Sequence, residues 1–370
     1  MRHDVAIVGA GILGLAHALA ALRAGLRPVV IERDARAAGA SVRNFGFITV
    51  TGQQAGATWN RARRSRAVWG EVAAPAGIAV EQAGLLMVAR RAEALAVLED
   101  FSRGPMGEGC ELLDAAGLAA AAPMLPPHAG ALYSPHEIRV ESRTAIPKLA
   151  AWLETQGVEF RRRTAVQGVE TGRLHTAGGP IDAERIVVCP GPDLVSLFPE
   201  VMARRDVTLC KLHMLRLADP GFRLPAALMS DLGLVRYLGY GASPRLPALR
   251  ARLEAEQADA LADGIHLIVV QSADGSLVVG DSHHYDPTPD PFQPEAVDRR
   301  ILAEFTAVTG IAVPVVTERW TGVYPSGPET AFTEAPLPGV RLAMVTSGTG
   351  ASTAFAIAEE TIADLLEHPG

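Results

Sequence analysis

The start of the chain alternates short apolar runs with one longer apolar segment. Asp4-Val-Ala-Ile-Val8 and Pro28-Val-Val-Ile31 are short and rich in β-branched residues, which predicts two strands. Between them, apolar residues recur at helical spacing from Ile12 to Ala24, and Gly25 marks the end of the predicted helix. Strand, helix and strand in this order predict a βαβ unit within a buried parallel sheet.

The pattern changes along the rest of the chain. A helical pattern with several arginines on one polar face covers Gly52 to about Ala76, and we expect that face to be solvated. From Val207 to about Trp320 apolar and polar residues alternate, which predicts long strands, with an Asp274-Gly275 hairpin turn. Other predicted strands cover 85–89, 341–345 and a meander over 158–188, and other helices cover 92–101, 144–156 and 352–366.

Composition narrows the class of protein. With 370 residues, of which 48% are hydrophobic and 20% charged, the chain is globular and large enough for two domains. A formal charge of −7 argues against nucleic acid or an anionic membrane as partner. The apolar stretch 5–22 is interrupted by glycines and His17, unlike a signal anchor. Three widely spaced cysteines fit neither a disulfide framework nor a zinc knuckle, so we expect a reducing cytoplasm.

The clearest chemical motif is Gly9-Ala-Gly11-Ile-Leu-Gly14, which follows the first predicted strand and opens the first helix. Gly9 permits a tight turn, Gly11 lets backbone approach a pyrophosphate, and Gly14 lets the helix pack on the strand. Glu32, 18 residues after Gly14, is placed to accept hydrogen bonds from a ribose, which favours FAD or NAD over NADP. The predicted cofactor contacts in this part are Gly9, Gly11, Ile12, Gly14, Glu32 and Arg33.

Two further segments favour FAD over NAD. The polar, glycine-containing segment Ala38–Gly46 follows in place of another βαβ unit. A second glycine-rich strand-to-helix turn, Thr346–Ser352, stands near the C-terminus, where a helix dipole could stabilise negative charge on a reduced flavin. Its two glycines and four hydroxyl groups exceed what an ordinary helix cap needs.

Together with Ile186–Gly191 and Trp320–Pro325, these segments resemble the D-amino-acid oxidase superfamily, which includes glycine and sarcosine oxidases. The resemblance implies an α/β fold with a Rossmann-like FAD-binding domain (1–80, 142–205 and 320–370). A mostly antiparallel β-sheet substrate-binding domain (81–141 and 206–319) would complete this discontinuous arrangement. The cofactor contacts that the resemblance adds are Ser41, Arg43, Asn44, Gly46, Val166, Gly191, Gly348, Thr349, Gly350 and Ala351.

Departures from the family's pattern narrow the chemistry. Glycine oxidases carry an arginine in a Trp-x-Gly-x-Arg-Pro pattern that binds the substrate carboxylate, whereas this chain has Tyr324 there. A tyrosine donates one hydrogen bond and cannot form the bidentate pair. No cysteine or histidine occupies the family's covalent-flavin positions, so the FAD should be non-covalent. The segment Gly280–Asp286 lacks the lysine that sarcosine oxidases place beside the flavin, which leaves oxygen or another electron acceptor open.

The predicted hairpin and Ser41–Gly46 resemble a subgroup associated with phosphonate breakdown. The resemblance implies oxidation of a small zwitterionic amine, 2-aminoethylphosphonate or its N-methyl derivative. A phosphonate dianion needs donors in a different place, which agrees with the missing arginine. A hydride would pass from the α C–H of the neutral amine to the flavin, and water would hydrolyse the imine to phosphonoacetaldehyde plus ammonia or methylamine.

Other functions stay open. The same fold would suit a glycine, sarcosine or D-amino-acid oxidase, or a 2-hydroxy-acid oxidase. A flavoprotein that holds FAD only as a scaffold within a larger complex is a third class. The oligomeric state is also open.

Histidines and a few polar residues are the candidates on the substrate side. Adjacent strand residues such as His283 and His284 point to opposite faces, so the two rings should not share a metal ion, and we predict no metal. His266 lies in phase with Ile268 and would suit either the pocket or the core. The predicted substrate contacts are Arg43, His266, His284, Tyr324 and Thr349, with His284 and Tyr324 as catalytic candidates and Lys211 and His213 as further anion contacts.

Overall fold

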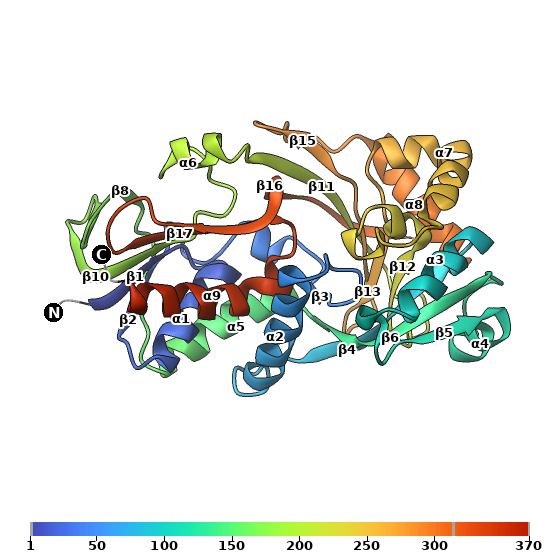
Figure 1. Ribbon diagram of the computed structural model, residues 1–370, viewed down its shortest axis with the longest axis horizontal. Helices are drawn as coiled ribbons and strands as arrows, with labels where there is room; N and C mark the ends of the chain where they lie inside the picture. Colours follow the sequence, from blue (N-terminus) through green and yellow to red (C-terminus); the bar gives the residue numbers. More distant parts are fainter. Residues whose placement is uncertain (1–2, 313–314, 369–370) are drawn as a thin grey trace.

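The computed structural model describes residues 3–312 and 315–368 and has a parallel sheet at one end (Figure 1). Its strand order is β7–β2–β1–β10–β17. The strands are β7 (Glu159–Arg161), β2 (Pro28–Ile31), β1 (His3–Val8), β10 (Ile181–Val188) and β17 (Val340–Ser347). Because β1 pairs in parallel with both β2 and β10, the predicted βαβ unit is confirmed and lies at the centre of this sheet.

Two apolar layers cover the parallel sheet. One face packs against α1 (Ile12–Arg23), α5 (Ser142–Thr155), α9 (Gly350–Glu367) and α2 (Ala57–Val72), whose buried residues form one cluster. The other face is covered by the β8 (Val166–Glu170) and β9 (Arg173–Thr176) hairpin and by α6 (Pro199–Arg204). The predicted α/β class follows from this layered arrangement.

The rest of the molecule is a mostly antiparallel sheet with its own core. The long strand β16 (Val316–Glu334) pairs antiparallel with β17 through its second half and with β11 (Thr208–Leu217) through its first half. Beyond β11 follow β14 (Leu277–Gly280), β13 (Ile268–Gln271), β12 (Ala227–Ser230), β4 (Val80–Ala89) and β6 (Gly130–Val140). Three short strands, β3 (Phe47–Ile48), β5 (Glu111–Asp114) and β15 (His284–Asp286), pair at its margins.

Two helices correct the prediction that strands fill Val207 to about Trp320. The segments α7 (Leu246–Ala262) and α8 (Glu295–Thr309) lie in the antiparallel half (Figure 1), as does α4 (Ala115–Ala121). There α7 packs on α3 (Ala92–Ser102), and α8 packs on β11 and β14. In α8 the buried residues Val297, Ile301, Phe305 and Val308 recur at helical spacing. The non-helical backbone at Gln257 interrupts α7, and few of its residues are buried, so its helical pattern is weak.

The arginine-rich helix α2 begins at Ala57, later than predicted. Its arginine face is only partly solvated, because Arg61 and Arg64 pair with Glu360 and Glu359 of α9 at 2.7 and 2.8 Å. Beneath these ion pairs, Trp69 and Phe355 pack edge to face with ring centroids 5.2 Å apart. The helix that follows the second glycine-rich turn is therefore anchored on α2. No helix in 3–312 or 315–368 is both long and apolar enough to span a membrane.

Replacing Phe355 by alanine tests this packing. Phe355 is 1% exposed, so Phe355→Ala should lower the free energy of unfolding by about 3–5 kcal/mol, the range for large buried aromatic residues. Phe292→Ala removes the same side chain from a site that is 72% exposed and should change stability by less than about 0.5 kcal/mol. Urea denaturation followed by circular dichroism measures both, and equal effects would contradict the packing role.

Candidate active site

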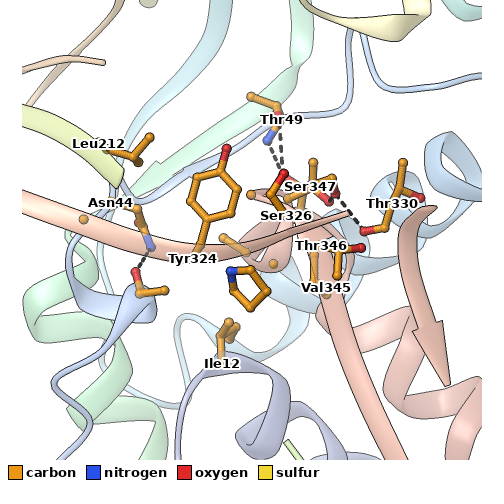
Figure 2. A pocket seen from close by; sticks show the side chains of 18 of the residues that line it. Ile12, Asn44, Thr49, Leu212, Tyr324, Ser326, Thr330, Val345, Thr346 and Ser347 are labelled. Carbon is orange, nitrogen blue, oxygen red and sulfur yellow. Dashed lines mark hydrogen bonds between the residues drawn. The ribbon is translucent and has the colours of Figure 1, made fainter. Parts of the chain in front are cut away.

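A cavity of about 440 Å³ lies between the two sheets. On the parallel-sheet side it is lined by Gly11–Gly14, by the loop 40–45 and by the turn 347–352 before and into α9. On the antiparallel side its wall includes Arg236, His266, Asp281 and His283. Figure 2 shows Tyr324 of β16 in the middle of the labelled lining residues, with Asn44 and Leu212 to its left and Ser326 and Ser347 to its right.

The turn between β1 and α1 depends on glycine. Gly9 has a φ of +100°, and a Cβ there would lie 2.5 Å from the carbonyl oxygen of Cys189, so backbone packs directly on backbone. A Cβ on Gly14 would overlap the carbonyl oxygen of Gly9. The Ile12 amide donates to Ser41 Oγ at 2.9 Å, which joins the loop 40–45 to the helix N-terminus. The turn therefore presents bare backbone to the cavity.

The second turn is held by its own hydroxyl groups. Gly348 has a φ of +72°, and a Cβ there would lie 3.1 Å from Cζ of Tyr324, so the tyrosine ring lies against the backbone. Ser347 Oγ and Thr349 Oγ1 are 2.8 Å apart, and Ser352 Oγ accepts from the Thr49 amide at 2.8 Å. The Trp69 indole donates to the carbonyl oxygen of Ala351 at 2.8 Å. The side chains thus fix the turn. Because the Ser352 amide donates to the carbonyl oxygen of Thr349 at 3.0 Å, the amides of α9 that remain for a ligand are those of Gly350 and Ala351.

These two turns fit FAD. The first amides of α1 and α9 lack intrahelical partners, and both helix N-termini line one cavity, so one long anionic ligand can contact both. Gly11–Gly14, Ser41, Asn44 and Gly191 would hold the pyrophosphate region. Gly348–Ala351 would hold the ring system.

The structure places the predicted residues in two groups. The following line the cavity: Gly11, Ile12, Gly14, Ser41, Arg43, Asn44, Gly191, His266, Tyr324, Gly348, Thr349, Gly350 and Ala351. The following do not: Gly9, Glu32, Arg33, Gly46, Val166 and His284. Gly9 and Gly46 instead shape the backbone, since a Cβ on Gly46 would overlap the carbonyl oxygen of Val140.

Three of the residues outside the lining have local partners. The Glu32 carboxylate accepts from the Ala10 amide at 2.8 Å and from the Asp34 amide at 2.9 Å, so it fixes the backbone of the first turn. Arg33 pairs with Asp193 at 2.8 Å. Val166 lies in β8 opposite Thr176. Within the lining, exposed Arg43 donates to the carbonyl oxygen of Ala38 at 2.8 Å.

His283 and His284 point in different directions, as predicted, but the residue that faces the cavity is His283 and not the predicted His284. His283 lines the cavity, whereas His284 faces His213 with ring centroids 5.6 Å apart. Alternation shows that neighbours point apart and does not show which one faces inward. Neither Lys211 nor His213 lines the cavity: Lys211 pairs with Asp290 and His213 with Asp298, both at 3.0 Å.

Arg236 is a cavity residue that the sequence analysis missed. It follows the 3-10 turn Asp231–Val235, and its guanidinium donates to the Tyr285 hydroxyl at 3.1 Å. Among the residues that the structure describes, no carboxylate forms an ion pair with Arg236. A single charged residue within the apolar run Leu234–Leu238 was the available signal. An arginine without a counter-ion in a cavity wall is a site for an anionic group.

His266, Asp281 and His283 form a buried cluster in the same wall. His266 Nδ1 lies 3.1 Å from Asp281 Oδ1, and His283 Nε2 lies 3.7 Å from Asp281 Oδ2. Burial raises the pKa of Asp281 to about 7 and lowers the pKa of both histidines well below the ordinary value. At neutral pH the histidines are therefore uncharged, while Asp281 can bind or release a proton.

Comparison with known proteins identifies the family of the chain. Residues 4–365 match the family model described as FAD dependent oxidoreductase. No curated protein matches the sequence. Among solved structures, a glycine oxidase from Geobacillus kaustophilus has a similar fold, with a TM-score of 0.80 and 20% identity over 100% of this chain and 95% of that one. An L-proline dehydrogenase from P. horikoshii matches with a TM-score of 0.78 and 17% identity over 99% of this chain and 93% of that one. A dithionite-reduced L-α-glycerophosphate oxidase from Mycoplasma pneumoniae with FAD bound matches with a TM-score of 0.76 and 16% identity over 99% of this chain and 95% of that one. At these identities the structures show the fold alone.

Glu32 provides a test of the first turn. Glu32→Ala removes two hydrogen bonds that fix the backbone of the first turn, each worth about 1.5–3 kcal/mol to the folded protein, so the turn should loosen and the dissociation constant of FAD should rise about 10-fold or more. Asp34→Ala is the control, because it keeps the Asp34 amide and removes an exposed carboxylate. Quenching of FAD fluorescence by the apoprotein gives both constants, and an unchanged value for Glu32→Ala would contradict the role of Glu32.

Proposed function

The chain belongs to the FAD dependent oxidoreductase family, and from that premise we propose that it oxidises a small amine that carries an acidic group. The observation that carries this proposal is Arg236, which forms no ion pair with a carboxylate in the described part of the chain and lies in the same cavity as the turn at Gly348. The acidic group would bind at Arg236. The amine would then face Tyr324 and the Asp281 cluster.

The residues around the amine end carry no positive charge that would repel the nitrogen of the substrate. Bound FAD supplies a hydride acceptor for the carbon next to that nitrogen. His266 and His283 are uncharged at neutral pH and do not repel an ammonium group, and Tyr324, whose pKa burial raises well above the ordinary value, stays a neutral hydrogen-bond donor. Alignment of the substrate between Arg236 and Tyr324 is the main contribution that this wall would make.

For the substrate itself we propose 2-aminoethylphosphonate or its N-methyl derivative, giving phosphonoacetaldehyde plus ammonia or methylamine. The position of Arg236 supports this choice. It lies after the turn Asp231–Val235, whereas glycine oxidases use the position of Tyr324 for the carboxylate contact. The Arg236 guanidinium and the Tyr285 hydroxyl together offer several donors to a tetrahedral dianion.

Oxidation of glycine, sarcosine or a D-amino acid is the second candidate, favoured by the ability of a guanidinium to bind a carboxylate as well. A 2-hydroxy acid could also bind Arg236 through its carboxylate, but it has no amine to place beside the Asp281 cluster.

Oxygen or another acceptor would reoxidise the flavin, which we propose to be non-covalent. A reducing, cytoplasmic setting is part of the proposal and is supported by three free cysteines.

Anaerobic mixing of the yellow holoprotein with candidate substrates tests the proposed function. We expect 2-aminoethylphosphonate or its N-methyl form to bleach the flavin band at about 450 nm, because each would donate a hydride to the cofactor. Glycine, sarcosine and 2-hydroxyglutarate are the comparisons. Bleaching by glycine or sarcosine alone would move the assignment to the second candidate, and a protein that none of the amines bleaches would contradict amine oxidation.

Replacing Arg236 tests the anion site. Arg236→Met should raise the substrate dissociation constant, taken from the saturation of the flavin reduction rate, about 10- to 100-fold, the effect of losing a charged hydrogen bond. Arg250→Met is the control, because exposed Arg250 bonds only to the carbonyl oxygen of Val235 at 3.2 Å outside the cavity. Equal constants for the wild type and Arg236→Met would place the anion elsewhere.

A further inference from the structure

We propose that Asp281 is the catalytic base that removes a proton from the ammonium group of the substrate, with the neutral rings of His266 and His283 beside its carboxyl group. The inference rests on the proposed amine oxidation and adds the group that prepares the substrate.

The reaction needs such a base. An alkylammonium group has an ordinary pKa near that of lysine, about 10.4, so the substrate arrives protonated at neutral pH. Loss of a hydride from carbon requires the nitrogen lone pair to form the C=N bond. In the proposed step an N–H bond breaks, the proton joins an Asp281 oxygen, and the electron pair stays on nitrogen. The neutral amine can then lose a hydride to become an iminium ion, which water hydrolyses to an aldehyde and an ammonium ion.

The geometry supplies an available carboxylate. Asp281, His266 and His283 are 4%, 3% and 7% exposed, and all three line the cavity. Within residues 3–312 and 315–368, Asp281 Oδ1 and His266 Nδ1 are buried and have no hydrogen-bond partner. Asp281 also has no ion pair there with arginine or lysine. A buried carboxylate that neutral histidines flank, and that no lysine or arginine pairs with in this part of the chain, can accept a proton.

The histidines can accept a hydrogen bond from protonated Asp281. His283 Nδ1 lies 2.9 Å from the carbonyl oxygen of Gly264, so Nδ1 carries the hydrogen and Nε2 presents a lone pair towards Asp281. His266 Nδ1 lies on the other side of the carboxylate. Because burial keeps both rings neutral, neither competes for the proton of the substrate.

The charges and the burial around Asp281 determine the pH at which it takes up a proton. Burial raises its pKa, and the charge of Arg236 opposes that shift. Burial raises the pKa values of the nearby Tyr237 and Tyr324 hydroxyls and of the buried Cys210 thiol, so none of these three groups is charged at neutral pH. Asp281 is therefore a carboxylate above a pH of about 7 and is protonated, hence unable to act as a base, below it.

The same three side chains have the ligand types of a metal site, with donor atoms within 4.8 Å of one another. The positive charge of Arg236 acts on all three and opposes the binding of a dication. It does not oppose a zwitterion, whose anionic end would lie at Arg236 and whose ammonium end would lie at Asp281. A proton carrier therefore suits this wall better than a metal ion does.

Anaerobic flavin reduction across pH 6–10 by the amine that bleaches the wild type tests the proposal. The wild-type rate should fall below a pH of about 7. Asp281→Asn should be slower at pH 7.5 by about 100-fold or more, the lower end of general-base effects, and should speed up towards high pH as free amine becomes available. Asp281→Glu keeps a carboxylate, so it should recover part of the rate and should again lose rate as the pH falls. Asp298→Asn is the matched control, because it alters a second His–Asp pair outside the cavity and should leave the profile unchanged.

A readout without turnover is the infrared band of a protonated carboxyl group in the substrate-free holoenzyme. This band should titrate near pH 7 in the wild type and be absent in Asp281→Asn. A wild-type enzyme that amines bleach with the same profile in Asp281→Asn would overturn the inference alone. A wild-type enzyme that no amine bleaches would overturn the proposed function and this inference with it. A metal ion bound by the wild type, lost in Asp281→Asn and required for bleaching would also overturn it.

Discussion

The site depends on one strand that belongs to two sheets. β16 pairs with β11 from Val316 to Ser326 and with β17 from Ser326 to Glu334, and the register shifts between Ser326 and Ala331. Tyr324 lies just before this shift, with its ring against Gly348 at the start of the second turn. A continuous backbone therefore sets the distance between the wall that receives the cofactor and the wall that carries Arg236 and Asp281. Neither sheet alone could build the cavity.

The proposed anion site lies on the antiparallel side of the cavity. Tyr324 and Arg236 line this cavity from two different segments, β16 and the residue after the turn Asp231–Val235. Solved structures of the same fold carry names as different as glycine oxidase, L-proline dehydrogenase and L-α-glycerophosphate oxidase. These matches cover both halves of the chain, so the fold alone does not identify the donor, and the proposed function rests on the residues of the cavity.

The parts that sequence could predict are those with local signals. The β1–α1 turn and the turn before α9 each combine glycines, a strand and a helix within a few residues, and both line the cavity. Asp281 and His283 lie two residues apart just after β14, but His266 precedes β13 and Arg236 follows the turn Asp231–Val235, so no short motif contains the whole wall. His284 was preferred over His283 because alternation gives relative directions only. The helix α7 was missed because Gln257 interrupts it and few of its positions are buried.

The two turns that meet at the cavity are distant in sequence, and this has a consequence for how the protein reaches its native state. The hydrogen bond between Thr49 and Ser352 joins residues 303 positions apart, and the one between Trp69 and Ala351 joins residues 282 apart. Contacts of this separation carry a large loop-closure entropy and form late in folding. A cofactor that contacts both turns acts as a link between the first and last elements of the chain and stabilises the native state by mass action. The supply of FAD during folding should therefore influence how much native protein a cell accumulates.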